Sequence, residues 1–190
     1  MHLLPLAALF TGAHWSAWIV MGALFLVRRW FITAGYHRYF AHRSYKMSRA
    51  MQFLMALGGT TAVQKGPLWW AAHHRHHHKH SDQPEDIHSP KRGFWWSHMG
   101  WVLCTKFDET RTELVPDLAK YPELRWLNRH PFIAPIILAT LVFGLGLLIT
   151  GTFTGGLGML FIGFFLSTIL LSHTTYTINS LSHVFGTRRY

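Results

Sequence analysis

The stretch FIAPIILATLVFGLGLLIT, residues Phe132–Thr150, decides what kind of fold this chain adopts. It holds 19 residues without a charge, and a helix needs about 20 apolar residues to cross the hydrocarbon core of a bilayer. A second apolar run, Leu157–Leu171, follows the Gly- and Thr-rich segment Gly151–Gly156 and reaches spanning length when extended to Thr175. Because unpaired backbone groups find no water inside a bilayer, both runs should be helical. They predict a transmembrane hairpin over residues 131–175, with its turn facing away from the cytoplasm.

The N-terminal block, residues 1–33, carries one further full span and part of another. Leu3–Phe10 is apolar, Thr11–His14 interrupts it, and Trp15–Val27 is apolar again; continued through Trp30–Ile32, this second part makes one full span. The first part is only about half as long as a membrane span. Two interpretations fit this pattern: a single long helix interrupted in the middle, or a hairpin whose first helix is incomplete at its beginning.

The distribution of charge favours a membrane protein over a nucleic-acid-binding protein. Charged residues make up 14% of the chain, against about 25% in a typical soluble domain. The net charge is +10, yet residues 1–27 and 130–187 contain no Lys or Arg. This segregation follows the positive-inside rule, by which basic segments stay in the cytoplasm. A basic nucleic-acid-binding face would not leave such long apolar blocks, so we expect no nucleic-acid partner.

Residues 34–130 are mixed in character and predict a cytosolic helical cap between the two membrane blocks. Met51–Val63 is apolar but too short to span a membrane, so it should lie along the bilayer surface or cover the cap. Asp82–Arg92 contains prolines and should be a loop, whereas Glu109–Arg129 predicts one or two polar helices. Residues 176–190 would begin a C-terminal cytosolic segment. The expected fold is an all-α integral membrane protein, with transmembrane helical hairpins below a helical cap.

The segment HHRHHHKH, His73–His80, is the strongest chemical signal, with six imidazoles in eight positions. Residues at i, i+3 and i+4 share one face of a helix. Either of two sets meets that spacing, and spacing alone does not choose between them: His73, His76 and His77, or His74, His77 and His78. Each set would offer one metal ion three neutral imidazoles, which are common metal ligands. A solvated cationic patch is the alternative for an isolated tract of this kind.

Two more histidine segments lie at the ends of apolar blocks. GYHRYFAHRSYK contains His37 and His42, which a regular helix separates by about 140°, so we expect them on different faces, flanking a site at a helix terminus. TYTINSLSHVFG contains Asn179 and His183, which are four residues apart and share a face. Polar groups at the end of a membrane helix often mark function. Since the chain has only eight Asp and Glu residues, the metal site should be nearly all histidine.

These motifs resemble those of the membrane fatty acid desaturases, of the acyl-CoA delta-9 (stearoyl-CoA) type, in a bacterial-like form. HRYFAH matches the first histidine box, H-x4-H; HRHHH matches the second, H-R-x-H-H; and NSLSH matches Asn-Ser-x-x-His. RGFWWSHMGW and ITAGYHR fit as well, and the resemblance covers nearly the whole chain. It implies four transmembrane helices below a cap that holds two iron ions. The ligands it implies are His37, His42, His74, His77, His78 and His183, with Asn179 acting through water.

The resemblance also implies a reaction and its partners. Family members convert a saturated acyl chain, O2 and two electrons to a cis alkene, so the expected substrate is a fatty acyl thioester such as acyl-CoA, desaturated at the delta-9 position. Metal-activated O2 is needed because no side chain can remove hydrogen from an unactivated methylene. The acyl tunnel would bend beside Gln64, Trp70 and Thr175. The electron donor would be a ferredoxin or cytochrome b5-like protein, and the location a bacterial inner membrane, with the histidine boxes facing the cytoplasm.

The chain departs from the family in one respect. Family members carry a third box, H-x-x-H-H, downstream of the Asn-Ser-x-x-His motif, and no such box occurs before Tyr190. We therefore expect a truncated sequence that is inactive on its own. Two other functions stay open: a related membrane di-iron hydroxylase or ketolase, and a non-enzymatic histidine-rich metal-binding membrane protein.

Overall fold

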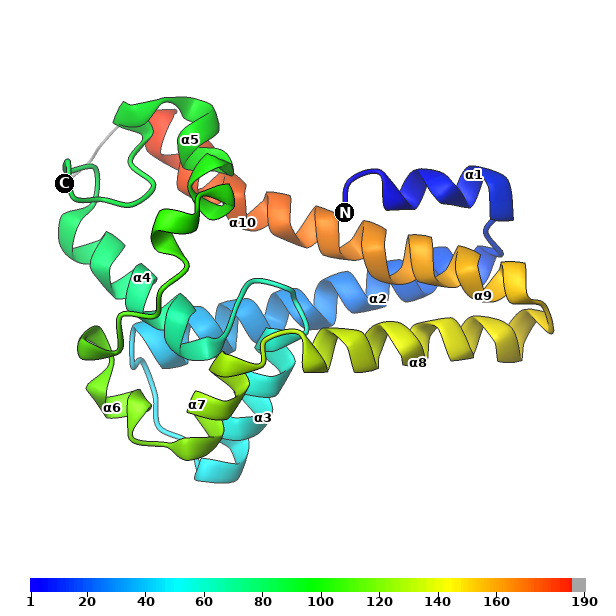
Figure 1. Cartoon of the computed structure of the whole chain (residues 1–190), viewed down its shortest axis with the longest axis horizontal. Coiled ribbons are helices and arrows are strands. Elements are labelled where there is room, and N and C mark those ends of the chain that lie inside the picture. The colour runs from blue at the N-terminus through cyan, green and yellow to red at the C-terminus, as the bar shows by residue number, and fades with distance from the viewer. Residues whose placement is uncertain (186–190) are drawn as a thin grey trace.

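The computed structural model describes residues 1–185, and within them the chain is helical and contains no strand. Figure 1 shows a stem of long helices and, at one end of it, a cap of shorter helices. Three helices of this described part are long and apolar enough to cross a membrane: Trp15–Ala41, Ile133–Thr150 and Phe153–Val184. The predicted all-α membrane fold is confirmed.

The stem is built from three continuous helical rods. Their elements, in chain order, are α2 (Trp15–Trp30) with its π-helical continuation η2 (Phe31–Ala41), α8 (Ile133–Thr150), and α9 (Phe153–Met159) with η7 (Leu160–Leu166) and α10 (Ser167–Val184). α8 and α9 form the hairpin expected from their apolar runs. Gly151 ends α8 in the left-handed region, with φ of +67°, which a residue without a Cβ adopts easily. The Thr152 hydroxyl then caps α9 by accepting the Gly155 N–H at 3.0 Å.

The N-terminal segment forms a short arm that folds back on the stem. η1 (Leu4–Ala7) and α1 (Ala8–Thr11) end at Gly12, which has a φ of +71°. α1 then packs against α9, and η1 packs against η7. Figure 1 shows the N-terminus beside the middle of the stem rather than at its far end. The arm and α2 therefore form a hairpin with one short side, not a single interrupted helix.

Two of the rods run without a break from the stem into the cap. The first passes residue 33 and ends at Ala41, and the third passes residue 175 and ends at Val184. The first histidine box and the Asn-Ser-x-x-His motif thus lie at the ends of the long helices that reach the cap. Of the predicted segment 176–190, residues 186–190 lie outside the described part of the chain.

The cap wraps around these inner ends. Its helices are α3 (Arg49–Thr60), α4 (Pro67–His80), α5 (Phe94–His98), α6 (Pro116–Ala119) and α7 (Pro122–Arg129), joined by short 3-10 turns at Pro90–Arg92, Gly100–Leu103, Thr105–Phe107 and Thr112–Leu114. Proline opens α4, α6 and α7, where its missing N–H costs nothing and its fixed φ suits the first turn. The predicted loop and polar helices are thus present, and the apolar segment at Met51 forms most of α3.

A buried cluster joins α3 to the first rod. Tyr36 is fully buried, and its hydroxyl lies 3.0 Å from the Thr60 hydroxyl and donates to the Lys65 carbonyl at 3.3 Å. Gly59 permits this close approach, since a Cβ there would lie 2.2 Å from the tyrosine ring. The packing fixes the end of the first rod against the cap, and with it the direction in which the first histidine box points.

A buried cation ties the first rod to the third. Arg28 is only 1% exposed and donates to the Leu24 and Thr61 carbonyls and to the hydroxyls of Thr168 and Ser167. Hydroxyl and carbonyl oxygens satisfy most of its five N–H donors, so the charge can be accommodated within the helical stem. The contact holds α2 against α10 directly below the cap.

Candidate metal centre

The first histidine pair faces one way, contrary to the expectation from regular helical spacing. η2 is a π-helix, in which each N–H bonds the carbonyl five residues earlier, and the N–H of His42 donates to the His37 carbonyl at 3.0 Å. A five-residue step is therefore close to one full turn, and the two Nε2 atoms lie 3.0 Å apart. The prediction that His37 and His42 lie on different faces is wrong, because it assumed an α-helical step. The pair does lie at a helix terminus, as expected.

Two histidines of α4 complete a group around this pair. The Nε2 atom of His74 lies 3.3 Å from that of His42, and the Nε2 atom of His78 lies 2.9 Å from that of His74. We call His37, His42, His74 and His78 the first cluster. One nitrogen from each lies within 4.8 Å of the others, an arrangement that suits four imidazole ligands of one metal ion.

Burial keeps the α4 members of the first cluster neutral. Burial and the adjacent imidazoles lower the pKa of His74 well below its usual range, and they lower the pKa of His78 to about 4. A neutral imidazole has a free lone pair on one nitrogen and can bind a metal, whereas an imidazolium cannot. Near pH 7 these rings are thus in the form that binds a metal.

His77, the remaining histidine of the second box, lies in a different group, so the structure does not gather it with His74 and His78. His77 packs against His88, with ring centroids 4.0 Å apart, and against His183 at 5.2 Å. We call His77, His88 and His183, with the carboxylates Asp82 and Asp86, the second cluster. Side chains at i, i+3 and i+4 lie on one broad face of α4, and those at different edges of this face reach different clusters.

Two carboxylates orient the imidazoles of the second cluster. Both oxygens of Asp86 lie 3.0 Å from Nδ1 of His77, and Oδ1 of Asp82 lies 3.0 Å from Nδ1 of His183. A metal-binding histidine commonly donates its other N–H to a carboxylate in this way. This arrangement leaves Nε2 of both rings available as lone-pair donors. The sequence predicts a site that is nearly all histidine, and it gives no indication of these two orienting carboxylates.

Asp86 is fully buried and His88 nearly so. Burial alone would raise the pKa of Asp86, but the hydrogen bond with His77 and the neighbouring His88 lower it to about 2. Burial lowers the pKa of His88 to about 3. The sequence interpretation missed Asp82, Asp86 and His88 because they lie in the segment assigned as a proline-containing loop, and only the tertiary fold brings that loop to α4.

His73 and His76, the two histidines that occur only in the alternative set, belong to neither cluster. Nδ1 of His73 lies 2.8 Å from the Trp69 carbonyl oxygen. His76 contacts the Glu85 carbonyl at 2.9 Å and Arg111 at 3.2 Å. Both rings thus serve hydrogen bonds within the cap.

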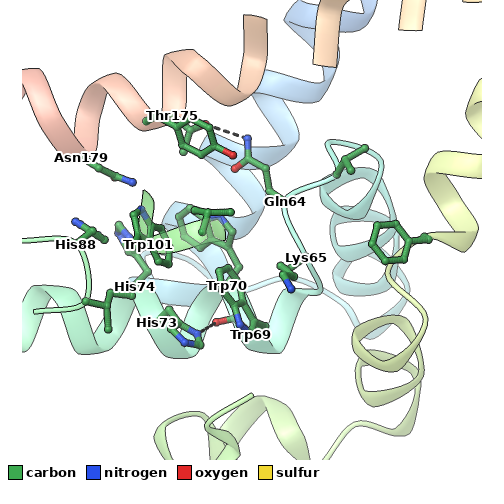
Figure 2. Close-up of a pocket in the computed structure, with 15 residues that line it drawn as sticks. Gln64, Lys65, Trp69, Trp70, His73, His74, His88, Trp101, Thr175 and Asn179 are labelled. Atoms are coloured by element: carbon green, nitrogen blue, oxygen red, sulfur yellow. Dashed lines mark hydrogen bonds between the residues drawn. The ribbon is translucent and has the colours of Figure 1, made fainter. Parts of the chain in front are cut away.

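A pocket with mainly aromatic and aliphatic walls borders both clusters. Its cavity volume is about 120 Å³. The predicted substrate residues Gln64, Trp70 and Thr175 all line it, and so does the predicted water-mediated ligand Asn179. Figure 2 shows the Gln64 amide donating to the Thr175 hydroxyl, at 3.0 Å, across the pocket.

The pocket wall is in direct contact with the first cluster. The rings of Trp70 and His74 are stacked, with centroids 4.6 Å apart and planes inclined by 27°. His74, His88 and Asn179 line the same end of the pocket (Figure 2). The carbonyl of Asn179 also accepts a hydrogen bond from Ser97 of α5, which fixes this part of α10 against the cap. An apolar ligand in the pocket would therefore lie beside the imidazole groups.

Comparison with known proteins defines the family. The fatty acid desaturase family model matches residues 13–190, and the chain belongs to this family. It is 35% identical over 183 residues to an sn-2 palmitoyl-lipid 9-desaturase of Nostoc sp. (strain 36), which covers 92% of this chain and 61% of that protein. It is 33% identical over 160 residues to an sn-1 stearoyl-lipid 9-desaturase of Anabaena variabilis, covering 84% and 56%.

A relative that acts on another carrier is similar at a comparable level. The acyl-CoA Delta(11) desaturase of Spodoptera littoralis is 31% identical over 191 residues, which cover 95% of this chain and 54% of that protein. The chain thus spans between about half and three fifths of the length of these relatives. Its histidine clusters are compatible with metal binding.

Proposed function

We propose that this chain forms the metal-binding part of an enzyme that introduces a cis double bond into a saturated fatty acyl chain, using O2 and two histidine-bound iron ions. One observation carries the proposal: two separate clusters of imidazoles border the same end of one largely apolar pocket. The donors fit the metal, because imidazole suits iron as well as zinc. In the first cluster, each Nε2 atom lies 2.9 to 3.3 Å from the Nε2 atom of a neighbouring histidine.

The reaction needs a cofactor because an unactivated methylene resists every amino-acid side chain. Bound iron would supply the activation of O2, while the protein supplies binding and orientation. In the balanced reaction two adjacent methylenes each lose one hydrogen, O2 takes up two electrons and two protons, and two water molecules form. We propose that Gln64, Trp70 and Thr175 bend the acyl chain, so that one pair of carbons lies beside the clusters. Asn179 would contribute through a water molecule.

Asp82 and Asp86 would hold the imidazoles of the second cluster in one tautomer. Each accepts Nδ1–H, so the lone pair is kept on Nε2. An acyl chain packed against Trp70 would lie beside His74, because the rings of the two residues are in contact. The remaining pocket wall excludes water from the reacting carbons, which protects a reactive site from side reactions.

We propose a delta-9 product, since the Nostoc and Anabaena relatives are named as 9-desaturases. The carrier of the acyl chain is acyl-CoA or a membrane lipid, because relatives of both kinds are similar to this chain. An assay with isolated membranes distinguishes the two. Labelled stearoyl-CoA should be desaturated as the thioester in the first case, and only after transfer to lipid in the second.

We further propose a bacterial inner-membrane location with residues 34–130 in the cytoplasm. A ferredoxin or cytochrome b5-like protein would deliver electrons to the basic face of the cap. The 16 Lys and Arg residues within 28–129 support this orientation, and an acidic donor would be steered by their field. Reduction of the protein by such a donor should slow strongly as salt is raised, and a rate independent of salt would contradict the docking proposal.

The test of function is expression, in a desaturase-deficient host, of the complete open reading frame to which this sequence belongs. Gas chromatography with mass spectrometry of the lipids should reveal a new monounsaturated fatty acid, with its double bond at carbon 9. The variants His74→Ala and His77→Ala, one for each cluster, should abolish it. A hydroxylated or keto product would instead favour the related hydroxylase or ketolase, and unchanged lipids with a metal-loaded protein would favour a metal-binding role.

A further inference from the structure

His88 lies in the second cluster but belongs to none of the histidine motifs. Its side chain is 4% exposed, and its ring centroid lies 4.0 Å from that of His77 and 6.4 Å from that of His183. Its Nδ1 atom is buried and has no hydrogen-bond partner among residues 1–185. Since nearly all buried polar atoms in native proteins find a partner, an imidazole placed here without one needs an explanation.

Asp86 faces the rings of His77 and His88 from the same side. Its Oδ1 atom lies 3.0 Å from Nδ1 of His77 and 4.0 Å from Nδ1 of His88. The two ring planes are inclined by only 35°. The same carboxylate oxygen therefore lies near Nδ1 of both rings.

Asp86 itself is occupied as a hydrogen-bond acceptor. It accepts the backbone N–H of Asp82 at 3.0 Å and that of His88 at 3.3 Å, in addition to the contact with His77. These bonds fix the loop from Asp82 to His88 around one carboxylate. They make Asp86 a positioning residue for the His77 imidazole and for the loop that carries His88.

We propose that His88 is an additional ligand of the second metal ion, beside His77 and His183. This inference rests on the proposed metal centre and adds a histidine outside the family boxes to it. His88 also lines the pocket together with Asn179 (Figure 2), so the same ring borders both the pocket and the second cluster.

Zinc titration of the purified, metal-free protein in detergent tests the assignment without turnover. Competition with a fluorescent chelator should give two Zn²⁺ ions per wild-type chain. His88→Gln should weaken one of the two sites at least tenfold and leave the other unchanged, as should His77→Gln, whereas His74→Gln should weaken the other site. The matched control is His76→Gln, also on the cap, whose ring bonds the Glu85 carbonyl and Arg111. It should retain both sites.

A thiol placed at the same position gives a direct spectroscopic readout. Cobalt-loaded His88→Cys should show a thiolate-to-Co²⁺ charge-transfer band in the near ultraviolet, because a coordinated thiol is deprotonated and bound to the metal. Wild type, which contains only Cys104, and His76→Cys should lack the band. Loss of zinc affinity in His88→Gln without a band in His88→Cys would overturn direct ligation.

The inference and the proposed function fail differently. If wild-type protein binds fewer than two ions, the proposed metal centre is wrong. If wild type binds two ions and His88→Gln binds both with unchanged affinity, the metal centre stands and the role of His88 is refuted.

Discussion

Arg75, the arginine inside the second histidine box, should be the main contact that holds the two histidine helices of the first cluster together. It lies on α4 next to His74, and it donates to the Phe40 and Ala41 carbonyls at the end of η2 at 2.7 and 3.2 Å. It also forms two hydrogen bonds with Asp117, at 2.7 and 3.0 Å. One guanidinium thus ties α4 both to the helix of the first box and to α6.

We expect Arg75→Met to destabilise the cap by about 3 kcal/mol. Removing one partner of a buried ion pair costs about 3–5 kcal/mol of folding free energy. The lower end of this range applies because the side chain of Asp117 is 33% exposed. Near 190 residues, each kcal/mol corresponds to about 2–4 °C in Tm, so thermal unfolding of the detergent-solubilised protein should shift down by roughly 6–12 °C.

The chain offers a matched control on the same carboxylate. Arg43 also pairs with Asp117, at 3.0 Å, but its side chain is 61% exposed, and an exposed pair contributes about 1 kcal/mol at most. Arg43→Met should therefore lower Tm by less than about 4 °C. A Tm for Arg75→Met no lower than that of Arg43→Met would refute the argument.

The same pair predicts a pH dependence with a definite sign. Burial raises the pKa of Asp117, but the hydrogen bonds from Arg75 and the charge of Arg43 outweigh it, and the pKa lies below its ordinary value. A carboxyl whose pKa is depressed by folding contributes stability above its unfolded pKa, and that contribution is lost as the pH falls through the folded pKa. The difference in Tm between wild type and Arg75→Met should hence be full at pH 7 and shrink below about pH 4.

Two further predictions concern the pocket and the packing beneath it. Gln64→Leu removes the 3.0 Å hydrogen bond to Thr175 and should move or scatter the double-bond position; mass spectrometry of the lipid products would show this, and an unchanged product would exclude a role in bending the acyl chain. Gly59→Ala would place a Cβ 2.2 Å from the Tyr36 ring and should cost about 1–3 kcal/mol by overpacking, whereas Gly144→Ala meets nothing within 4 Å and should leave Tm almost unchanged.

The membrane fold was predictable because the bilayer imposes a strong constraint on the sequence. A charge-free run of 19 residues such as Phe132–Thr150 has few alternatives to a spanning helix, since its backbone must bond to itself. The fold-back at Gly12 was open to two interpretations, because the short apolar run before it carries no information about direction. Only its packing against α9 and η7 decides between them.

The grouping of the histidines was less predictable, for two physical reasons. His37 and His42 come together because this segment is a π-helix. Whether an N–H bonds the carbonyl four or five residues earlier cannot be told from the spacing of residues in the sequence. His77 separates from His74 and His78 because a second group of side chains packs on its side of α4. Helical periodicity gives the direction of a side chain but not the identity of what meets it there.

The carboxylates of the second cluster were not predictable from local pattern. Asp82 and Asp86 lie in a loop without helical periodicity, and neither has histidine at a helical spacing that would predict the contact. Their role follows from the fold, which brings the loop between α4 and the end of α10, where Asp82 meets His183 across 101 positions in sequence. Long-range contacts of this kind require knowledge of the tertiary structure.

The division of the imidazoles between two clusters has a mechanical consequence. The first cluster joins α4 to η2, and the second joins α4 to α10 and to the loop that contains His88. α4 is therefore the element common to both, and it also carries Trp70 in the pocket wall. A ligand that binds only the folded arrangement stabilises it in proportion to its concentration over Kd. Metal bound at the second cluster should thus hold the cap end of α10 in place. Because α10 carries Thr175, which bonds Gln64 in the pocket wall, the shape of the pocket should depend on whether this metal is bound.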